Sequence, residues 1–187
     1  GKSTGLSRIE QELTNRGYKV YVVAETATEV IMGGIKPSEV PWLEFQKSIF
    51  EIQTMKEKVF RERALEYSKE HNVDSVIIYD RGLLDAKAFM NDSDYNTLLK
   101  VEKCKEIEVK DSYDGVFHLK TAADGAEEFY TLENNGARSE SPEQARIVDK
   151  KIIQAWTGHP HLRIIDNSTN FREKIDRLMA EIYGLLG

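Results

Sequence analysis

The first four residues, Gly1-Lys2-Ser3-Thr4, have the residue types and the spacing to bind phosphate. They match the second half of the motif G-x-x-x-x-G-K-[ST], in which backbone N–H groups surround the phosphates and the lysine reaches the β- and γ-phosphates. The first hydroxyl residue, here Ser3, is the position that holds Mg²⁺. The following residues are expected to form a helix whose positive dipole end faces the anion. The alternative is an N-cap serine beside a surface lysine.

A loop of this type needs a buried strand and an upstream glycine before it. Neither precedes Gly1 in the sequence. We therefore expect about a dozen further residues before Gly1, enough for a strand and the first half of the loop.

Charged side chains directly follow two predicted strands. Glu25 follows residues 18–24, and Asp80 and Arg81 follow residues 75–79. Polar groups at the carboxyl ends of parallel strands face the crevice in which open α/β sheets bind ligands. We interpret Asp80 as a metal ligand, Arg81 as a phosphate clamp, and Glu25 as a substrate-binding residue or general base. The alternatives are a helix cap at Glu25 and a surface turn at Asp80.

Two further groups of candidates follow the later strands. Residues 120–146 contain many turn formers and few apolar side chains. We predict a lid over the phosphates there, with Arg138 and Arg146 stabilising phosphoryl transfer; a solvated loop is the alternative. After the last predicted strand, Asp166 and Asn167 are placed to read a nucleobase edge. Alternatively, residues 167–170 only cap the next helix, where Asn170 and Glu173 have the spacing of a capping box.

The elements that must position these residues can be read from periodicity. Strands are predicted at residues 18–24, 75–79, 116–119 and 162–165, and helices at 3–16, 42–71, 142–156 and 171–186. A further helix is predicted from Ser93 through Cys104. His118, within the third strand, is interpreted as a buried structural histidine. In the 42–71 helix, the apolar stripe predicted to face the core consists of Phe45, Ile49, Ile52, Met55, Val59 and Phe60.

Composition sets limits on partners and location. The chain has 187 residues and a formal net charge of −6, which argues against non-specific nucleic-acid binding but permits a local basic pocket. No apolar run is long enough for a membrane span. The single cysteine, Cys104, cannot form an internal disulfide, which is typical of reducing compartments. We therefore expect a cytoplasmic protein.

The ordered set of segments resembles the NadR/Ttd-type AAA-like phosphate-loop domains, which look like nucleoside and nucleotide kinases in architecture. The resemblance spans nearly the whole chain. Its most specific strings are TAADGAEEFYTLENN (121–135) and GHPHLRIIDNS (158–168), with GKST, VVAE and IIYDRGLLDAKAFM before them. It implies a single α/β domain over residues 1–187, a three-layer P-loop NTPase with a mostly parallel sheet flanked by helices, whose first strand would precede Gly1.

Together, the residue patterns and the resemblance give one set of candidate residues. The catalytic candidates are Glu25, Asp80, Arg81 and Arg138. The nucleotide-binding candidates are Gly1, Lys2, Ser3, Thr4, Arg146, Asp166 and Asn167. The metal ligands are predicted to be Ser3 and Asp80.

The predicted function is Mg²⁺-dependent binding of ATP or GTP by a kinase-like phosphotransferase that acts on a small nucleoside- or nucleotide-type acceptor. The alternative is a nucleotide-dependent switch with slow hydrolysis, which the strings shared with the Ttd branch favour. An inert structural domain is a third interpretation. The choice between ATP and GTP stays open because no Asn-Lys-x-Asp guanine signature occurs.

Overall fold

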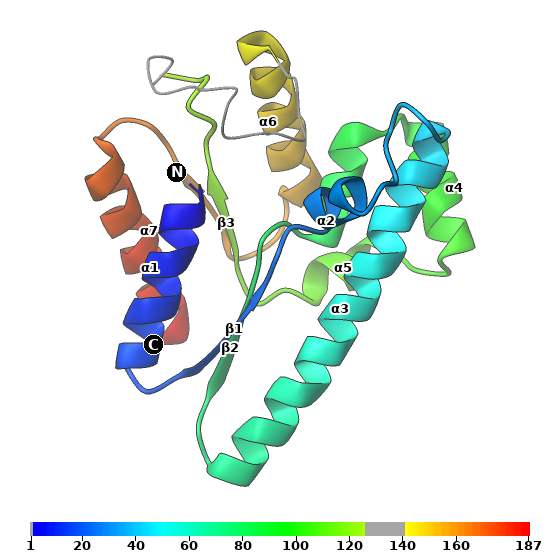
Figure 1. Ribbon diagram of the computed structural model, residues 1–187. Coiled ribbons are helices and arrows are strands. Elements are labelled where there is room, and N and C mark those ends of the chain that lie inside the picture. The colour runs from blue at the N-terminus through cyan, green and yellow to red at the C-terminus, as the bar shows by residue number, and fades with distance from the viewer. Residues whose placement is uncertain (1, 126–140) are drawn as a thin grey trace. The chain divides into compact units, whose positions relative to one another are not determined.

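The computed structural model describes residues 2–125 and 141–187 as helices, short strands and connecting loops (Figure 1). The chain divides into two compact units, Gly1–Leu83 and Leu84–Gly187. Each unit contains one pair of hydrogen-bonded strands, and both pairs are parallel. The prediction of an α/β fold with parallel strands flanked by helices is confirmed.

The first unit is built around strands β1 and β2, which pair from Lys19 opposite Ser75 to Val23 opposite Tyr79. Because the strands are parallel, the residues that follow both of them emerge at the same edge. The backbone N–H of Asp80 donates to Val23 O at 2.9 Å, which extends the pairing by one residue beyond β2. The elements of this unit are α1 (Lys2–Asn15), β1 (Lys19–Val23), α2 (Thr26–Met32), α3 (Trp42–His71) and β2 (Ser75–Tyr79).

Helix α1 packs on β1 through the apolar face expected from its sequence. Ile9 and Leu13 are buried, and Leu13 is fully inaccessible to solvent. The chain leaves the helix through Gly17, whose φ of 94° lies in the left-handed region that favours glycine. This tight exit allows the chain to return along α1 as β1.

Helix α3 has the predicted bounds, but the predicted core stripe is wrong in part. Phe45 is buried, whereas Ile52, Met55 and Val59 are 40%, 59% and 42% exposed. The helix is rotated so that polar residues enter its buried face. That face consists of Phe45, Gln46, Phe50, Gln53, Glu57 and Ala64.

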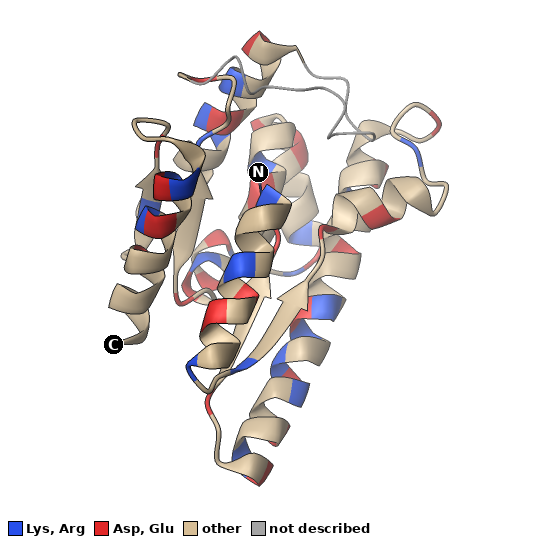
Figure 2. Cartoon of the chain, turned by 60° about the vertical axis from the view of Figure 1, so that its left-hand side comes forward, with Lys and Arg blue, Asp and Glu red and all other residues tan. Residues whose placement is uncertain are grey.

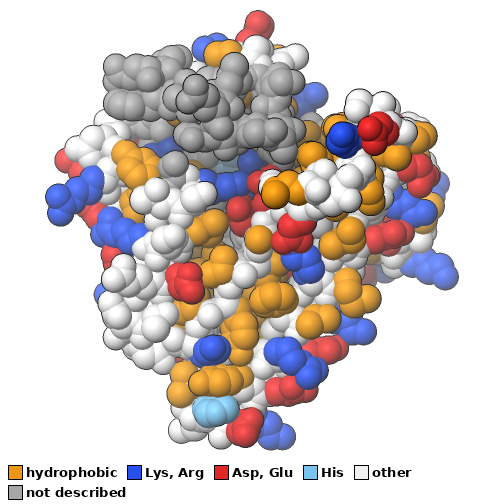
Figure 3. All heavy atoms as spheres, in the orientation of Figure 1, with side chains coloured by type: hydrophobic (Ala, Val, Ile, Leu, Met, Phe, Trp, Pro, Cys, Tyr) orange, Lys and Arg blue, Asp and Glu red, His pale blue; other side chains and the backbone are white. Residues whose placement is uncertain are grey.

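The outer face of α3 is mixed in character. Figure 2 shows basic and acidic residues alternating with others along the helix, and Figure 3 shows hydrophobic side chains on the same face of the molecule as charged ones. Arg63 forms an ion pair with Glu66 at 3.1 Å, one turn further along. Both residues are exposed, so this pair belongs to the solvated face of the helix.

The second unit is built around strands β3 and β4, which pair from Val116 opposite Leu162 to Leu119 opposite Ile165. Its core includes Leu84, Leu98, Trp156, Leu178 and Met179, none of which is more than 3% exposed. Its elements are the 3₁₀ helix η1 (Leu83–Phe89), α4 (Asp92–Val101), α5 (Glu106–Asp111), β3 (Val116–Leu119), α6 (Pro142–Trp156), β4 (Leu162–Ile165) and α7 (Phe171–Leu186).

Side-chain caps determine where α6 and α7 begin. Ser141 and Gln144 form a reciprocal capping box at the start of α6, and Pro142 occupies its first turn. The side chain of Asn170 accepts from the backbone N–H of Glu173 at 2.9 Å at the start of α7. Both starts agree with the sequence prediction.

The single helix predicted from Ser93 through Cys104 is wrong. Helix α4 ends at Val101, and α5 begins only at Glu106. Lys103, between them, has a φ of 53°, a left-handed value that a continuous helix cannot accommodate. The start is capped by the side chain of Asn91.

In the part of the chain that the structure describes, no helix combines the length and the apolar character needed to cross a membrane.

Candidate functional site

The N-terminal turn of α1 presents the phosphate-loop residues. Lys2 is the first residue of the helix, Ser3 and Thr4 follow in its first turn, and all three are exposed. The first backbone N–H groups of a helix have no partner within the helix and carry its positive dipole end. This end of α1 is therefore suited to an anion. Gly1, the other candidate in the motif, lies outside the described residues.

Lys2 joins the carboxylates that follow the two strands of the first unit. Its Nζ lies 2.8 Å from Asp80 Oδ1 and 3.5 Å from Glu25 Oε2. The side chains of Asp80 and Glu25 are 13% and 18% exposed, against 40% for Lys2. Both acids thus lie at the same edge of the strand pair, where the exposed Lys2 ammonium group faces their two half-buried carboxylates.

Arg81 completes this group with an unusual backbone conformation. Its φ is 85°, although it has a side chain, and such a conformation costs about 1–3 kcal/mol in most contexts. Its Nε lies 3.9 Å from Glu25 Oε1. The two oxygens of the Glu25 carboxylate therefore face two different cations, Lys2 and Arg81.

Glu25 occupies the N-cap position of α2 but makes no capping hydrogen bond with its side chain. Instead, its Oε2 accepts from the hydroxyl of Thr28 at 3.2 Å. Glu25 therefore has the backbone position of a helix cap, but its carboxylate does not cap the helix. The carboxylate faces Lys2 and Arg81 instead.

Oxygen donors suited to Mg²⁺ are present in this unit. The Ser3 hydroxyl and the Asp80 carboxylate are hard oxygen ligands of the kind Mg²⁺ prefers, alongside phosphate oxygens and water. Among residues 2–125 and 141–187, no group of three or more His, Cys, Asp or Glu side chains is arranged to hold a metal.

The sequence analysis missed the polar residues on the buried face of α3, beside these charged groups. Gln46, Gln53 and Glu57 are only 5%, 4% and 4% exposed. These polar side chains recur at helical spacing in the sequence. Because the buried face of the helix was chosen by its apolar residues alone, the polar ones were left on the solvent side. Their contacts reach the loops that carry Glu25 and Arg81.

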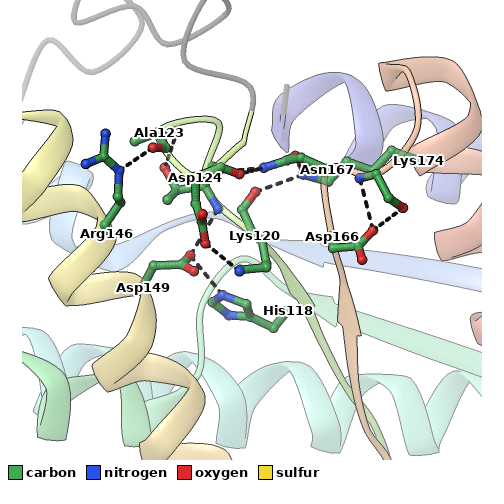
Figure 4. Close-up of polar contacts among 11 residues, drawn as sticks. His118, Lys120, Ala123, Asp124, Arg146, Asp149, Asp166, Asn167 and Lys174 are labelled. Carbon is green, nitrogen blue, oxygen red and sulfur yellow. Dashed lines mark hydrogen bonds and ion pairs between the residues drawn. The ribbon is translucent and has the colours of Figure 1, made fainter.

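In the second unit, Asp166 directly follows β4 and is exposed (Figure 4). Its Oδ1 accepts from the Ser168 hydroxyl at 2.6 Å and from Arg177 Nη1 at 2.9 Å. Hydrogen bonds from Ser168 and Arg177 lower the pKa of Asp166 to about 2. The carboxylate is thus ionised at neutral pH and helps to fix the loop between β4 and α7.

The neighbouring Asn167 side chain holds the turn that follows β3. Its Nδ2 donates to Thr121 O at 2.8 Å and to Asp124 O at 2.7 Å, and its Oδ1 accepts from Lys174 Nζ at 2.5 Å. Burial lowers the pKa of the Lys174 ammonium group. A nucleobase could bond the Asn167 amide nitrogen only by displacing one of these carbonyls, because both of its N–H groups are used.

Two residues of α6 also contact the turn after β3 (Figure 4). Arg146 Nε donates to Ala123 O at 2.5 Å. Asp149 Oδ1 accepts from Thr121 N at 3.1 Å and from His118 Nε2 at 2.9 Å, and the side chains of Asp149 and His118 are each 8% exposed. His118 is therefore buried, as expected, with its ring bonded to an aspartate.

Several other sequence candidates have structural partners or lie outside the description. Arg138, the predicted lid arginine, lies outside the described residues, as does much of the 120–146 segment. Asp85, which lies shortly after Arg81 in the sequence, accepts a hydrogen bond from Trp156 Nε1 at 2.6 Å. The structure thus brings together Lys2, Glu25, Asp80 and Arg81 in the first unit, and Arg146, Asp166 and Asn167 contact the loops after β3 and β4 in the second.

Comparison with known families places this geometry in context. A family model described as "AAA domain" matches residues 1–174. The chain belongs to the AAA domain family. The predicted AAA-type family is thus confirmed.

A comparison of folds gives a separate finding. The deoxyadenosine kinase from M. mycoides, solved with bound dATP, superposes with a TM-score of 0.50 and 19% sequence identity, over 98% of this chain and 94% of that one. At this identity the match identifies the fold alone. None of the curated protein sequences matches this AAA domain chain.

Proposed function

We propose that this AAA domain protein is a kinase-like phosphotransferase that binds ATP or GTP with Mg²⁺ and phosphorylates a small nucleoside- or nucleotide-type acceptor. The observation that carries the proposal is the contact of Lys2 with Asp80 and Glu25 at the N-terminus of α1. A lysine at a helix N-terminus, an acid after one strand and a second acid after its neighbour are the parts that phosphoryl transfer from a nucleotide requires.

The first unit would bind the phosphates. The N-terminal backbone of α1, with Gly1, Ser3 and Thr4, would surround them, and Lys2 would neutralise the β- and γ-phosphate oxygens. Ser3 and Asp80 would hold Mg²⁺, which when bound would offset the charge that develops on the transferred group.

Glu25 and Arg81 would act on the acceptor. Glu25 would orient the acceptor hydroxyl and take its proton as the oxygen bonds to the γ-phosphorus. The bond from the γ-phosphorus to the bridging oxygen breaks in the same step, so a nucleoside diphosphate leaves. Arg81 would stabilise the negative charge of the transferred group through its planar guanidinium.

We propose that residues of the second unit also take part in nucleotide binding. We propose that Asp166 and Asn167 shape a loop beside the nucleobase, and that the 120–146 segment is a lid with Arg138 and Arg146 as its cationic residues. Support for this part is the set of hydrogen bonds that fixes the turn after β3 to the loop after β4. We propose one functional domain over residues 1–187, in the cytoplasm, in keeping with the single cysteine.

Calorimetric titration of the full chain with ATP and with GTP, each with Mg²⁺, tests the proposal. Lys2→Ala should abolish binding of the preferred nucleotide, whereas Lys58→Ala, which removes an exposed lysine from the outer face of α3, should not change it. Equal affinity of wild type and Lys2→Ala would refute the phosphate site.

Turnover tests the chemistry separately. With a panel of nucleosides and nucleotides as acceptors, Asp80→Asn should lower kcat by about 100-fold or more. Unchanged turnover in Asp80→Asn would remove this residue from the site. Tight binding with slow hydrolysis, and no acceptor phosphorylated, would instead support the switch function that the sequence left open.

A further inference from the structure

A buried polar network lies on the face of α3 that is turned toward the charged group of the first unit. Thr26, Gln53 and Glu57 are 2%, 4% and 4% exposed. Burying polar side chains is unfavourable unless their hydrogen bonds are made within the protein. Apolar side chains at these positions would pack α3 against the strands without this requirement, so the network needs a reason other than packing.

The amide of Gln53 connects the two loops that carry the catalytic candidates. Its Oε1 accepts from the Thr26 hydroxyl. Its Nε2 donates to Glu57 Oε1 at 2.9 Å and to the backbone carbonyl of Arg81 at 3.4 Å. Both amide hydrogens and the carbonyl oxygen are therefore used within the protein, and the side chain has a fixed orientation.

Lys56, three residues beyond Gln53 on α3, binds the segment that contains Glu25. Its Nζ donates to Ala24 O at 2.9 Å, to Thr26 Oγ1 at 3.1 Å and to Glu29 Oε2 at 2.9 Å. Its side chain is only 18% exposed. The residues on both sides of Glu25 are thus bonded to one ammonium group.

These contacts bear on the geometry of catalysis. We propose that Gln53 and Lys56 are positioning residues that set the separation of Glu25 from Arg81. Lys56 fixes the backbone around Glu25, and Gln53 joins that segment to the carbonyl of Arg81, the residue with the left-handed backbone. A strained conformation persists only where its surroundings hold it, and Gln53 supplies one such bond.

The inference rests on the proposed phosphotransfer and deepens it. In that proposal Lys2 binds the nucleotide, and its ion pairs among the described residues are with Glu25 and Asp80, not with Gln53 or Lys56. Loss of the network should therefore lower kcat and leave nucleotide affinity nearly unchanged. A displacement of about 1 Å in a reacting group can cost about 100-fold in rate.

The test uses Gln53→Met and Lys56→Met, which keep most of the side-chain volume and remove the hydrogen bonds. We expect kcat to fall about 10- to 100-fold, with the calorimetric Kd for the nucleotide within about twofold of wild type. Lys56→Arg should restore much of the kcat because it keeps a cation and its donors. Lys58→Met, two residues further along the same helix, is the matched control and should behave as wild type.

Amide hydrogen exchange provides a readout that does not need activity. Both Met variants should exchange faster in residues 24–28 and 80–82 than wild type, with the remaining peptides of the first unit unchanged. Unchanged kcat and exchange would overturn the inference, and so would faster exchange spread evenly over residues 2–83, because that pattern indicates general destabilisation. If wild type phosphorylates no acceptor, the proposed function fails, whereas exchange still decides whether the network orders these loops.

Discussion

Removal of the Asp149 carboxylate from α6 should destabilise the second unit by an amount that can be worked out from its contacts. Asp149 Oδ1 is the acceptor for His118 Nε2 and for the backbone N–H of Thr121, in a place where the side chains of Asp149 and His118 are 8% exposed. Asp149→Ala leaves the buried His118 donor and the half-buried Thr121 N–H without this acceptor. Each loss costs about 1–3 kcal/mol, so we expect a total of about 2–6 kcal/mol.

Urea denaturation, monitored by tryptophan fluorescence, measures this loss of stability in the second unit. Trp156 is buried in the second unit, and the chain has one other tryptophan, Trp42 on α3. A Trp42→Phe background therefore assigns the signal to Trp156. With an m-value of about 2 kcal/mol per M, Asp149→Ala should lower the urea midpoint by about 1–3 M. Lys150→Ala, an exposed neighbour on α6, should stay within about 0.5 kcal/mol of wild type.

A double-mutant cycle with His118→Ala separates the two donors. If the His118 bond contributes, the free-energy changes of His118→Ala and Asp149→Ala should be non-additive by about 1–3 kcal/mol. The reasoning would be refuted if Asp149→Ala unfolded at the wild-type midpoint, or if the two changes added without coupling.

Two further predictions concern glycines and a carboxylate. Gly17 has a φ of 94°, so Gly17→Ala should lower the free energy of unfolding by about 1 kcal/mol. Gly184 lies inside α7 with open space at its Cβ position, so Gly184→Ala should raise it by about 0.5–1 kcal/mol. Thermal unfolding measures both variants, and shifts of the same sign in the two melting temperatures would contradict this prediction. For Glu106, burial raises the pKa, but the hydrogen bonds from Lys87 and Tyr95 outweigh burial and the net shift is below the ordinary value of 4.5. Because the folded pKa is the lower one, ionised Glu106 contributes stability above its unfolded pKa, and this contribution is lost as the pH falls through the folded pKa. The difference in stability between wild type and Glu106→Gln should therefore be constant near neutral pH and shrink in acid, and urea midpoints that show no such convergence would count against the ion pair.

Local signals in the sequence were sufficient for many elements of the fold. The Ser141-Pro142 pair is a local signal for the start of α6, and the capping spacing of Asn170 and Glu173 is one for the start of α7. These signals depend on residues a few positions apart, so a single sequence contains them. The break between α4 and α5 has no such signal, because neither glycine nor proline marks the left-handed Lys103.

Tertiary contacts explain what could not be predicted. The strand-end rule brought Glu25 and Asp80 together, since parallel pairing alone places both at one edge. The orientation of α3 could not be found in this way, because periodicity assigns polar residues to solvent. Gln53 is buried only because Thr26 and the carbonyl of Arg81, distant in the sequence, supply its partners. The roles predicted for the candidate residues themselves stay predictions until nucleotide binding is measured.

Because α6 has its own capping box, the segment before this helix can be exchanged between members of the family. Ser141 and Gln144 satisfy each other's backbone groups, and Pro142 presets the first turn, so the start of the helix is encoded within four residues. Asp149 stands about two turns beyond that start, and its register relative to His118 follows from it. Residues 126–140 can therefore be exchanged with those of a relative, junctions placed before Ser141, without shifting the phase of α6. Such chimeras would let that segment be varied for its effect on nucleotide or acceptor choice while the rest of the second unit keeps its contacts.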